Sequence, residues 1–503
     1  MNVVPMTPLT NVRILKEVPL DSSYTDTMDF SSISAQTTYF QGKTKYTYSN
    51  LGPVRLQNSI RIPNTADNLY DCNYIMFQNA NFNTKWFYAF ITEIKFINVN
   101  MCEVNFEIDI MQTWMFDVTL KACYVEREHS ATDNVGDNMV LENVDLGEYV
   151  NETGEKTPFF DSYMAVIATA YDPSGEAGGY FGGTFSGLSY VAGLIDDDAG
   201  VKNVLDFLDS AVKANKADSI TSTFVMPSIF YTKDTAPVMQ RYEVNKKQTS
   251  LGSYTPINKK LLTYPYNFLL VTTSDGASAK YRYEYFQGDT SAFVVECAMG
   301  CNPEIVLEPI AYNNQQFNID ESLALSGFPQ FGFSIDTFRA WLAQNGNSQF
   351  ISAATSALAV VGGTVTGNPM AVAGGFLGIA SNINNFVMAS YKADQSRGAQ
   401  GSNTLVGTRE KNFYFYQRHI REDYAKIIDD YFTVYGYATE EVKVPNIKTR
   451  TSWNYVKTRN SKITGSVPFE DIERMKKVYD NGVTFWHGEY IGDYSRNNSP
   501  IGG

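Results

Sequence analysis

One long stretch without charge constrains how this chain can fold. Residues 340–391 contain no Lys, Arg, Asp or Glu, although 19% of the whole chain is charged. Two apolar arms stand out within it, FISAATSALAVV at 350–361 and MAVAGGFLGIA at 370–380, the second continuing to residue 391. The sequence GGTVTGNP between the arms is rich in residues that favour turns. The pattern predicts a helical hairpin, or a long loop that can become one.

Two interpretations of this stretch remain open. A permanent transmembrane helix needs about 20 predominantly apolar residues, and polar residues such as Ser352, Asn382 and Asn384 interrupt both arms. A buried core hairpin or an oligomer interface would explain that composition. Small residues at four-residue spacing, such as Gly374 and Gly378, instead favour close helix packing in lipid. The second interpretation is therefore a segment that enters a membrane conditionally.

The membrane interpretation assigns lipid contact to the apolar and small residues of the two arms. The candidate membrane-insertion residues are Ile351, Leu358, Val360, Val361, Met370, Val372, Gly374, Phe376, Leu377, Gly378, Ile379, Phe386, Val387 and Met388.

The composition predicts a β-rich protein of several domains. At 503 residues the chain is too long for one core, and its 33 Tyr and 32 Phe favour strands. A net charge of −14 argues against stable wrapping around nucleic acid and suits a channel that DNA passes without sticking. The five cysteines, an odd number, are expected to be free thiols of a protein made in a reducing cytoplasm. We find no signal-peptide pattern in the first residues.

Sequence patterns divide the chain into four predicted parts. These are the N-terminal part of a β domain, a mixed distal region, the apolar insertion and a C-terminal part, at 1–150, 151–335, 336–400 and 401–503.

Alternating and helical spacings predict individual elements within these parts. Residues 85–97 and 103–110 are expected to form an antiparallel hairpin, which a strand at 112–116 extends. A second hairpin is expected from residues 268–273 and 281–285.

Three amphipathic helices are also predicted. The first lies near residues 201–212, and the last runs from about 468 to 481, with acids at its start and bases at its end. The apolar face predicted for the helix between them consists of Ile420, Tyr424, Ile427, Ile428, Tyr431 and Phe432.

The sequence contains no recognisable catalytic or metal site. Its three histidines, His129, His419 and His487, lie far apart and show no metal-ligand spacing. Cys297 and Cys301 form a single pair, which is more typical of structural thiols. A carboxylate pair for glycoside hydrolysis stays open, because 54 acids offer many pairs and none stands out. We therefore expect a protein without enzymatic activity, metal or cofactor.

Several short stretches resemble a known family of phage proteins. They are EVPLD at 17–21, YIMF at 74–77, KWFYAF at 85–90, FEIDIMQTW at 106–114, VEREH at 125–129, TYPYN at 263–267, VPN at 444–446, NYVKT at 454–458 and NGVTFWH at 481–487. Together they resemble the tail knob, or distal tail tube, proteins of small short-tailed phages of the Picovirinae type, which infect Gram-positive bacteria. The matching stretches lie on both sides of the apolar stretch and span nearly the whole chain.

The resemblance implies an architecture and a role. Members of the family form a hexameric tube at the far end of the tail, and a hydrophobic loop from each subunit plugs the lumen. On infection the loops enter the host cytoplasmic membrane and form a pore for DNA. For this chain the resemblance implies a place in the virion, with other tail proteins (upper tail tube, lower collar, tail tip) and membrane lipid as partners. DNA would pass through without specific binding.

The resemblance also sets the expected fold class. It implies a β-rich α+β, multidomain protein with a tail-tube-like antiparallel β domain, a mixed distal domain and an inserted hydrophobic hairpin. The N- and C-terminal parts of the chain would join in one tube domain.

Other functions are compatible with the residues alone. In a cell-wall hydrolase or receptor-binding protein of the tail tip, the apolar stretch would serve only for packing. A pore-forming toxin would explain the stretch but not the missing secretion signal.

Overall fold

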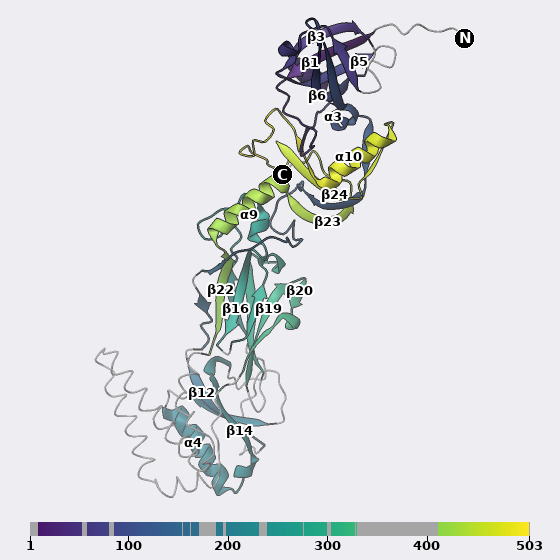
Figure 1. Cartoon of the computed structure of the whole chain (residues 1–503). Coiled ribbons are helices and arrows are strands. Elements are labelled where there is room, and N and C mark those ends of the chain that lie inside the picture. The colour runs from purple at the N-terminus through teal and green to yellow at the C-terminus, as the bar shows by residue number, and fades with distance from the viewer. Residues whose placement is uncertain are drawn as a thin grey trace, which may run out of the picture. The chain divides into compact units, whose positions relative to one another are not determined.

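Strands from both ends of the chain share one of the two units of the structure (Figure 1). The computed structural model describes residues 9–52, 58–79, 85–152, 154–160, 162–170, 188–194, 198–230, 239–274, 276–298, 303–326, 328 and 411–501. Unit 1 consists of Met1–Gly147, Tyr254–Leu262 and Glu422–Gly503. Unit 2 consists of Glu148–Ser253 and Thr263–Arg421. The four-part division by sequence stays a prediction, since its boundaries around the apolar insertion lie outside the described residues.

One sheet of unit 1 is six-stranded and antiparallel. Its order is β3-β1-β5-β6-β7-β4, with bounds Thr44–Leu51, Thr10–Lys16, Cys72–Asn79, Phe87–Asn98, Met101–Ile108 and Ser59–Ile62. Both faces of this sheet are apolar. One face packs Val12, Ile14 and Ile75 together, and the other packs against Phe40 of helix α1 (Ile33–Gly42).

The predicted hairpin of this sheet is confirmed as β6 and β7, but its predicted extension is wrong. Residues Ile110–Trp114 form helix α3 instead of a strand. The cause is Asp109, whose side chain accepts a hydrogen bond from the backbone N–H of Gln112 (3.0 Å) and so caps the helix. Its other oxygen accepts a hydrogen bond from the Tyr74 hydroxyl (2.8 Å). Asp109 is only 1% exposed.

Replacing Asp109 with Asn should remove one pH-dependent contribution to the free energy of unfolding. Burial raises the pKa of Asp109 from 3.8 to about 6. The resulting stabilisation, about 3 kcal/mol, is fully present below the unfolded-state pKa and is lost as the pH rises through about 6. Urea unfolding of both proteins across this window should show the loss as a change in the difference between their free energies of unfolding, because the other groups titrate alike in both. The same pH dependence in both proteins would contradict the burial of an ionisable group here.

A five-stranded sheet of unit 1 combines strands from both ends of the chain. Its order is β2-β26-β24-β9-β23, with bounds Asp26–Met28, Val483–Trp486, Trp453–Arg459, Cys123–Glu128 and Tyr437–Lys443. Only β2 and β26 pair in parallel. A separate ribbon joins β8 (Val118–Lys121) to β25 (Lys462–Gly465), and α2 (Ala66–Leu69) is a single turn. Formation of this sheet therefore requires strands from both ends of the sequence.

Helix α10 (Phe469–Asn481) confirms the predicted helix at about 468–481. Pro468 precedes its first turn, and Gly482 ends it with a φ of +96° that favours glycine. Met475, Val478 and Tyr479 are buried on its inner face. Local signals were therefore sufficient for this helix.

Helix α9 (Glu422–Tyr435) also exists, but its predicted face is partly wrong. Ile428 and Phe432 are buried as predicted, whereas Ile427 is 67% exposed. Ile420 belongs to the preceding strand. The buried face includes Asp429, a charged residue that helical spacing of apolar residues cannot select.

Asp429 holds a segment of the chain that enters unit 1 from the middle of the sequence. Its carboxylate accepts hydrogen bonds from the Tyr254 hydroxyl (2.7 Å) and from the backbone N–H groups of Ile257 (2.7 Å) and Asn258 (2.9 Å). The Asn258 amide donates another (2.7 Å). These bonds compensate for burying the charge.

The described residues of unit 2 form three antiparallel sheets and helix α4 (Asp198–Lys213), which confirms the helix predicted near 201–212. One sheet has the order β10-β22-β16-β17, with bounds Tyr149–Asn151, Phe413–Ile420, Asn267–Thr273 and Ser278–Tyr281; β11 (Glu155–Lys156) also pairs with β22. The second has the order β13-β12-β14, with bounds Ser189–Leu194, Tyr163–Thr169 and Ile220–Pro227. The third has the order β15-β18-β19-β20, with bounds Met239–Asn245, Thr290–Ala298, Glu304–Tyr312 and Gln315–Phe317; β21 (Leu323–Leu325) also pairs with β19.

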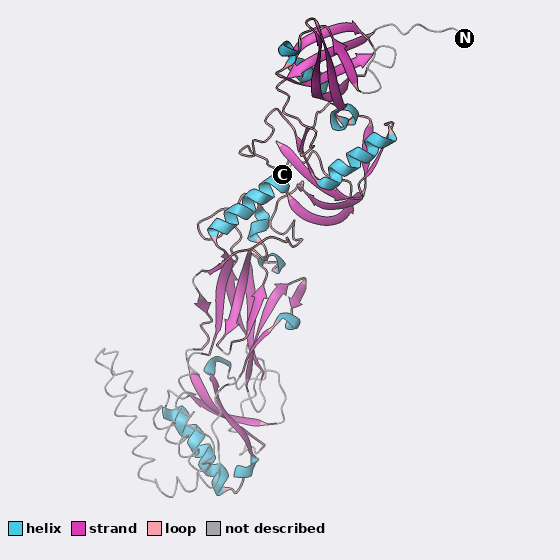
Figure 2. Ribbon diagram, viewed as in Figure 1, coloured by secondary structure: helices cyan, strands magenta, loops and turns pink. Residues whose placement is uncertain are grey.

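The hairpin predicted from residues 268–273 and 281–285 is confirmed, but its second strand lies earlier than predicted, at Ser278–Tyr281. β16 pairs with β17, but residues Tyr283–Tyr285 form a 3₁₀ turn, η4, rather than a strand. Further 3₁₀ turns are η1 (Ala217–Ser219), η2 (Ser228–Phe230), η3 (Lys259–Leu262) and η5 (Ile319–Glu321). With strands prevailing over helices in the described residues, the expected β-rich α+β, multidomain class is confirmed (Figure 2).

Candidate functional site

All fourteen predicted membrane-insertion residues lie within 329–410, outside the described residues. The structure describes the chain on either side of them, at Phe328 and from Lys411 onward. Among the described residues, no helix is both long and apolar enough to cross a lipid bilayer. The geometry available for the site is therefore that of its two ends.

The upstream end of the segment is fixed by pairing and by an aromatic side chain. β21 pairs with β19 through Leu323 to Leu325. Phe328, only 5% exposed, belongs to the apolar core of unit 2. The described residues upstream of the segment, Leu323–Leu325 and Phe328, are therefore held by unit 2.

The downstream end is fixed by Asn412, which is 5% exposed. Its side-chain amide donates a hydrogen bond to the carbonyl of Thr157 (3.1 Å), and its side-chain oxygen accepts from the Thr157 hydroxyl and from the Phe413 N–H. Its backbone exchanges two hydrogen bonds with Ser274, each 3.2 Å long. The next residue begins β22, which lies between β10 and β16 and is labelled beside β16 in Figure 1.

Lys411 joins the two ends to each other. Its Nζ donates a hydrogen bond to the backbone carbonyl of Ser326 (2.5 Å) and lies 5.5 Å from the ring centroid of Phe328. The side chain is 9% exposed, so the contact is largely shielded from water. We call Ser326, Phe328, Lys411 and Asn412 the neck. The neck contains no group arranged for chemistry and acts as an anchor.

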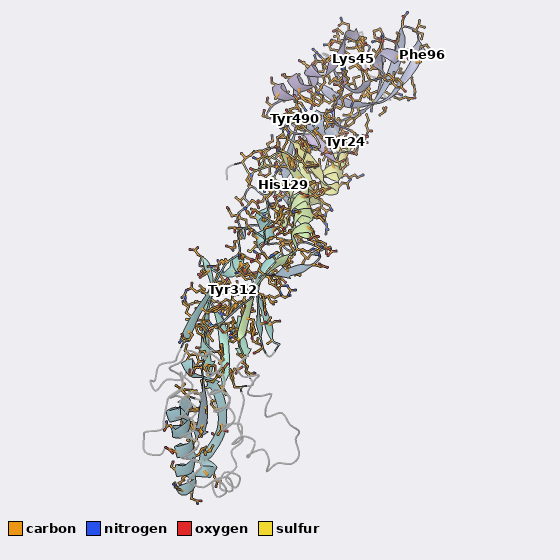
Figure 3. All side chains as sticks on the ribbon, turned by 90° about the vertical axis from the view of Figure 1, so that its left-hand side faces the viewer. Tyr24, Lys45, Phe96, His129, Tyr312 and Tyr490 are labelled. Atoms are coloured by element: carbon orange, nitrogen blue, oxygen red, sulfur yellow. The ribbon has the colours of Figure 1, made fainter. Side chains whose placement is uncertain are left out.

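The histidines serve as packing and hydrogen-bonding groups. His129, labelled in Figure 3, is buried and accepts a hydrogen bond at Nδ1 from the Tyr455 N–H (2.8 Å). Its Nε2 lies 3.1 Å from the Thr433 carbonyl oxygen, to which it donates. This fixes one neutral tautomer, and burial lowers the pKa of His129 from 6.5 to about 3.

The other candidate ligands do not converge within the described part of the chain. His419 belongs to unit 2 and His487 to unit 1. In the described ranges no group of three or more His, Cys, Asp or Glu side chains could hold a metal ion. Cys72, Cys102, Cys123 and Cys297 are buried thiols, and Cys301 lies outside the described residues.

Comparison with known families identifies the chain. A model of the C-terminal domain of tail knob protein gp9 of Bacillus phage phi29 matches residues 231–499, which is more than half of the chain. The chain belongs to the tail knob protein family. A second model, of the N-terminal part of caudoviral major tail proteins, matches residues 8–119 of this tail knob protein. These residues include the whole six-stranded sheet of unit 1.

Relatives of this tail knob protein match it over their whole length. The tail knob protein gp9 of Bacillus phage B103 is 27% identical, with 99% of this chain and 100% of the relative covered. That of Bacillus phage phi29 is 26% identical with the same coverage. The alignments run over 603 and 607 positions, so the relatives carry insertions relative to this chain of 503 residues. These relatives are structural tail proteins of short-tailed phages and not enzymes, as the sequence predicted.

A solved structure shows the same fold. The tail knob protein gp12 of bacteriophage C1 superposes with a TM-score of 0.59 at 16% identity, covering 98% of this chain and 100% of that one. At this identity the likeness establishes the fold alone.

The neck residues were not found from the sequence. Lys411 and Asn412 stand just before the alternating strand FYFYQRHI, a place where polar residues are ordinary. Lys411 donates a hydrogen bond to the backbone carbonyl of Ser326, 85 residues earlier. Because every residue has a backbone carbonyl, the sequence does not indicate this partner.

Proposed function

We propose that this tail knob protein assembles into a hexameric tube at the distal end of the phage tail. In this proposal the apolar segment of each subunit plugs the lumen in the virion. On infection the segments enter the host cytoplasmic membrane and form a pore through which the genome passes. The candidate membrane-insertion residues named above would contact the lipid.

One observation carries this proposal: a long uncharged stretch is inserted between two anchored strands of unit 2. β21 and β22 flank it, and both belong to sheets whose cores are formed by described residues. The described residues of these sheets form an apolar core of their own, which supports a role other than folding for the stretch.

The net charge supports a conduit rather than a nucleic-acid binder. A charge of −14 per chain repels phosphate, and binding of duplex DNA depends mainly on Lys and Arg. A tube wall of this kind would let DNA pass without retaining it. Membership of the tail also makes other tail proteins partners of the chain.

Replacing residues 350–391 by a short Gly-Ser linker tests the proposal. The linker variant should form an oligomer of wild-type stoichiometry by analytical ultracentrifugation, because the described cores are left intact. It should release no dye from anionic liposomes under conditions in which the full chain does. Electron microscopy should show an open centre.

Two results would count against the proposal. A linker variant that is monomeric would assign the segment to assembly instead of penetration. Equal dye release by the variant and the full chain would place membrane activity elsewhere in the protein.

A further inference from the structure

Two stretches of unit 1 form one long antiparallel pair of strands. β8 continues into β9 after a single residue, and β24 continues into β25 after two. The stretches pair on both sides of this junction, from Val118↔Gly465 at one end to Glu128↔Val456 at the other. We call residues 118–128 together with 453–465 the long ribbon.

One face of the long ribbon packs against the core of unit 1. Val456 and Ile463 belong to the same apolar cluster as Met475 of helix α10. Figure 1 shows α10 alongside β24. Successive side chains of a strand point to opposite faces. Lys457, beside Val456, and Lys462, beside Ile463, therefore lie on the other face of the ribbon.

This other face, which we call the cationic face, carries four cations and one acid. Lys457 and Arg459 have side chains that are 41% and 69% exposed, and both pair with Glu126 (3.2 and 2.6 Å). Lys121 and Lys462 are also exposed and lie directly opposite each other. A local excess of positive charge is unusual for a chain whose net charge is −14.

The pair of Lys121 and Lys462 is unfavourable in the isolated chain. Like charges directly opposite each other on paired strands destabilise a sheet. Among the described residues neither lysine forms an ion pair. The remaining charged residues of the ribbon are compensated, since Arg127 pairs with Glu142 and Glu128 with Lys443 (2.8 Å). An anionic partner outside the chain would relieve the repulsion.

The chemistry of the cationic face fits the phosphates of DNA better than a lipid surface. The long ribbon contributes no exposed large hydrophobic side chain, whereas a bilayer surface is bound by an apolar face that enters the headgroup and acyl boundary. Lys and Arg bind DNA phosphates without regard to sequence. Arg459 is held over the ring of Tyr124, 5.8 Å from its centroid, which orients the guanidinium group.

We propose that the cationic face borders the DNA path and contacts the phosphates of the passing duplex. The inference rests on the proposed conduit function and adds the surface that DNA touches. The contact is independent of sequence and is screened by salt. The acidic remainder of the chain repels phosphate and keeps the contact weak, so that DNA slides along the face without being retained.

Binding of a short linear duplex to the assembled full-length protein tests this inference. Lys121→Gln with Lys462→Gln removes the two uncompensated cations, and Lys16→Gln with Lys95→Gln removes the same charge from the six-stranded sheet as a matched control. In fluorescence anisotropy at about 50 mM salt, the ribbon variant should bind at least about tenfold more weakly than wild type, and the control within about twofold. The slope of log affinity against log salt should fall by about 1.8 for the ribbon variant, or about 0.9 for each lost phosphate contact.

The ribbon variant should keep the stoichiometry of the wild type and melt at the same temperature or above it, because the substitutions remove a repulsion between exposed groups. Equal weakening in the ribbon and control variants would assign the effect to net charge and overturn the inference. Wild-type protein that binds no duplex would also overturn it, and would leave the conduit function to the linker variant. Loss of binding to anionic liposomes with unchanged duplex binding would assign the face to lipid and overturn the inference.

A closed circular duplex tests whether the face borders a path through a tube. A circle has no end that enters a tube, so it should bind at least about tenfold more weakly than a linear duplex of the same length. Equal affinity for both, in protein that is oligomeric, would place the face on the outside of the assembly and overturn the inference alone. Wild-type protein that is monomeric in analytical ultracentrifugation would refute the conduit function and the DNA path together.

Discussion

Replacing Phe376 with Asp should abolish dye release from anionic liposomes while leaving the oligomer intact. Phe376 lies in the second apolar arm of the uncharged stretch. An Asp or Lys at the centre of a membrane helix costs about 2.5–3.5 kcal/mol. If six subunits insert together and the costs add, the penalty per ring is on the order of 15–20 kcal/mol. In a virion the variant should still adsorb to cells but fail to deliver DNA.

Phe376→Leu is the matched control, because it keeps an apolar side chain of similar size. It should release dye like the wild type. The melting temperature of the proposed ring separates the two interpretations of the stretch. A membrane role leaves melting and assembly of the Asp variant close to wild type, whereas a core role lowers both. An Asp variant that still empties liposomes would rule out insertion through this arm.

Local signals in the sequence were enough for some elements and not for others. Helix α10 was predicted nearly to the residue, since Pro468 and Gly482 bound an amphipathic pattern. The same kind of reasoning extended β7 into a strand at 112–116, where helix α3 lies. In the sequence, Asp109 fits the alternating pattern as one more polar position of a strand, although it caps helix α3. Its burial depends on Tyr74, 35 residues away, so the local pattern does not reveal it.

Contacts between distant residues explain the remaining differences. The buried Asp429 interrupts an apolar helix face because its partners, Tyr254 to Asn258, come from a segment more than 170 residues earlier. The neck depends likewise on Lys411 and Ser326. In both cases the residue type, Asp or Lys, indicates an exposed position. Only the folded structure shows which partners form hydrogen bonds with the buried charged group. The apolar stretch itself needed no partner to be recognised, since its uncharged composition is a property of the sequence alone.

Replacing His129 with Gln should remove a large acid-sensitive contribution to the stability of unit 1. The pKa of His129 is lowered by burial, and further by the nearby Arg450 and Arg127, from 6.5 to about 3. The neutral ring stabilises the fold above pH 6.5, and this contribution is lost as the pH falls through about 3. The shift corresponds to about 5 kcal/mol in total, at about 1.4 kcal/mol per pH unit. At pH 7 the Gln variant should be less stable than wild type, because the bonds to Tyr455 and Thr433 are disturbed.

The difference in unfolding free energy between variant and wild type isolates His129, because the other groups titrate alike in both proteins. Denaturant unfolding should show the gap narrowing steadily as the pH falls below 6.5. Asp109 gives the opposite sign, since its raised pKa makes the wild type gain stability on acidification between about pH 6 and 4. On acidification over that window, the free energy of unfolding of H129Q relative to wild type should therefore rise, and that of D109N relative to wild type should fall. In the wild type the two contributions partly cancel. If the difference for H129Q stays constant with pH, His129 takes up a proton in the folded protein as readily as in the unfolded chain. That result would contradict a buried ring that is hydrogen-bonded through both nitrogens.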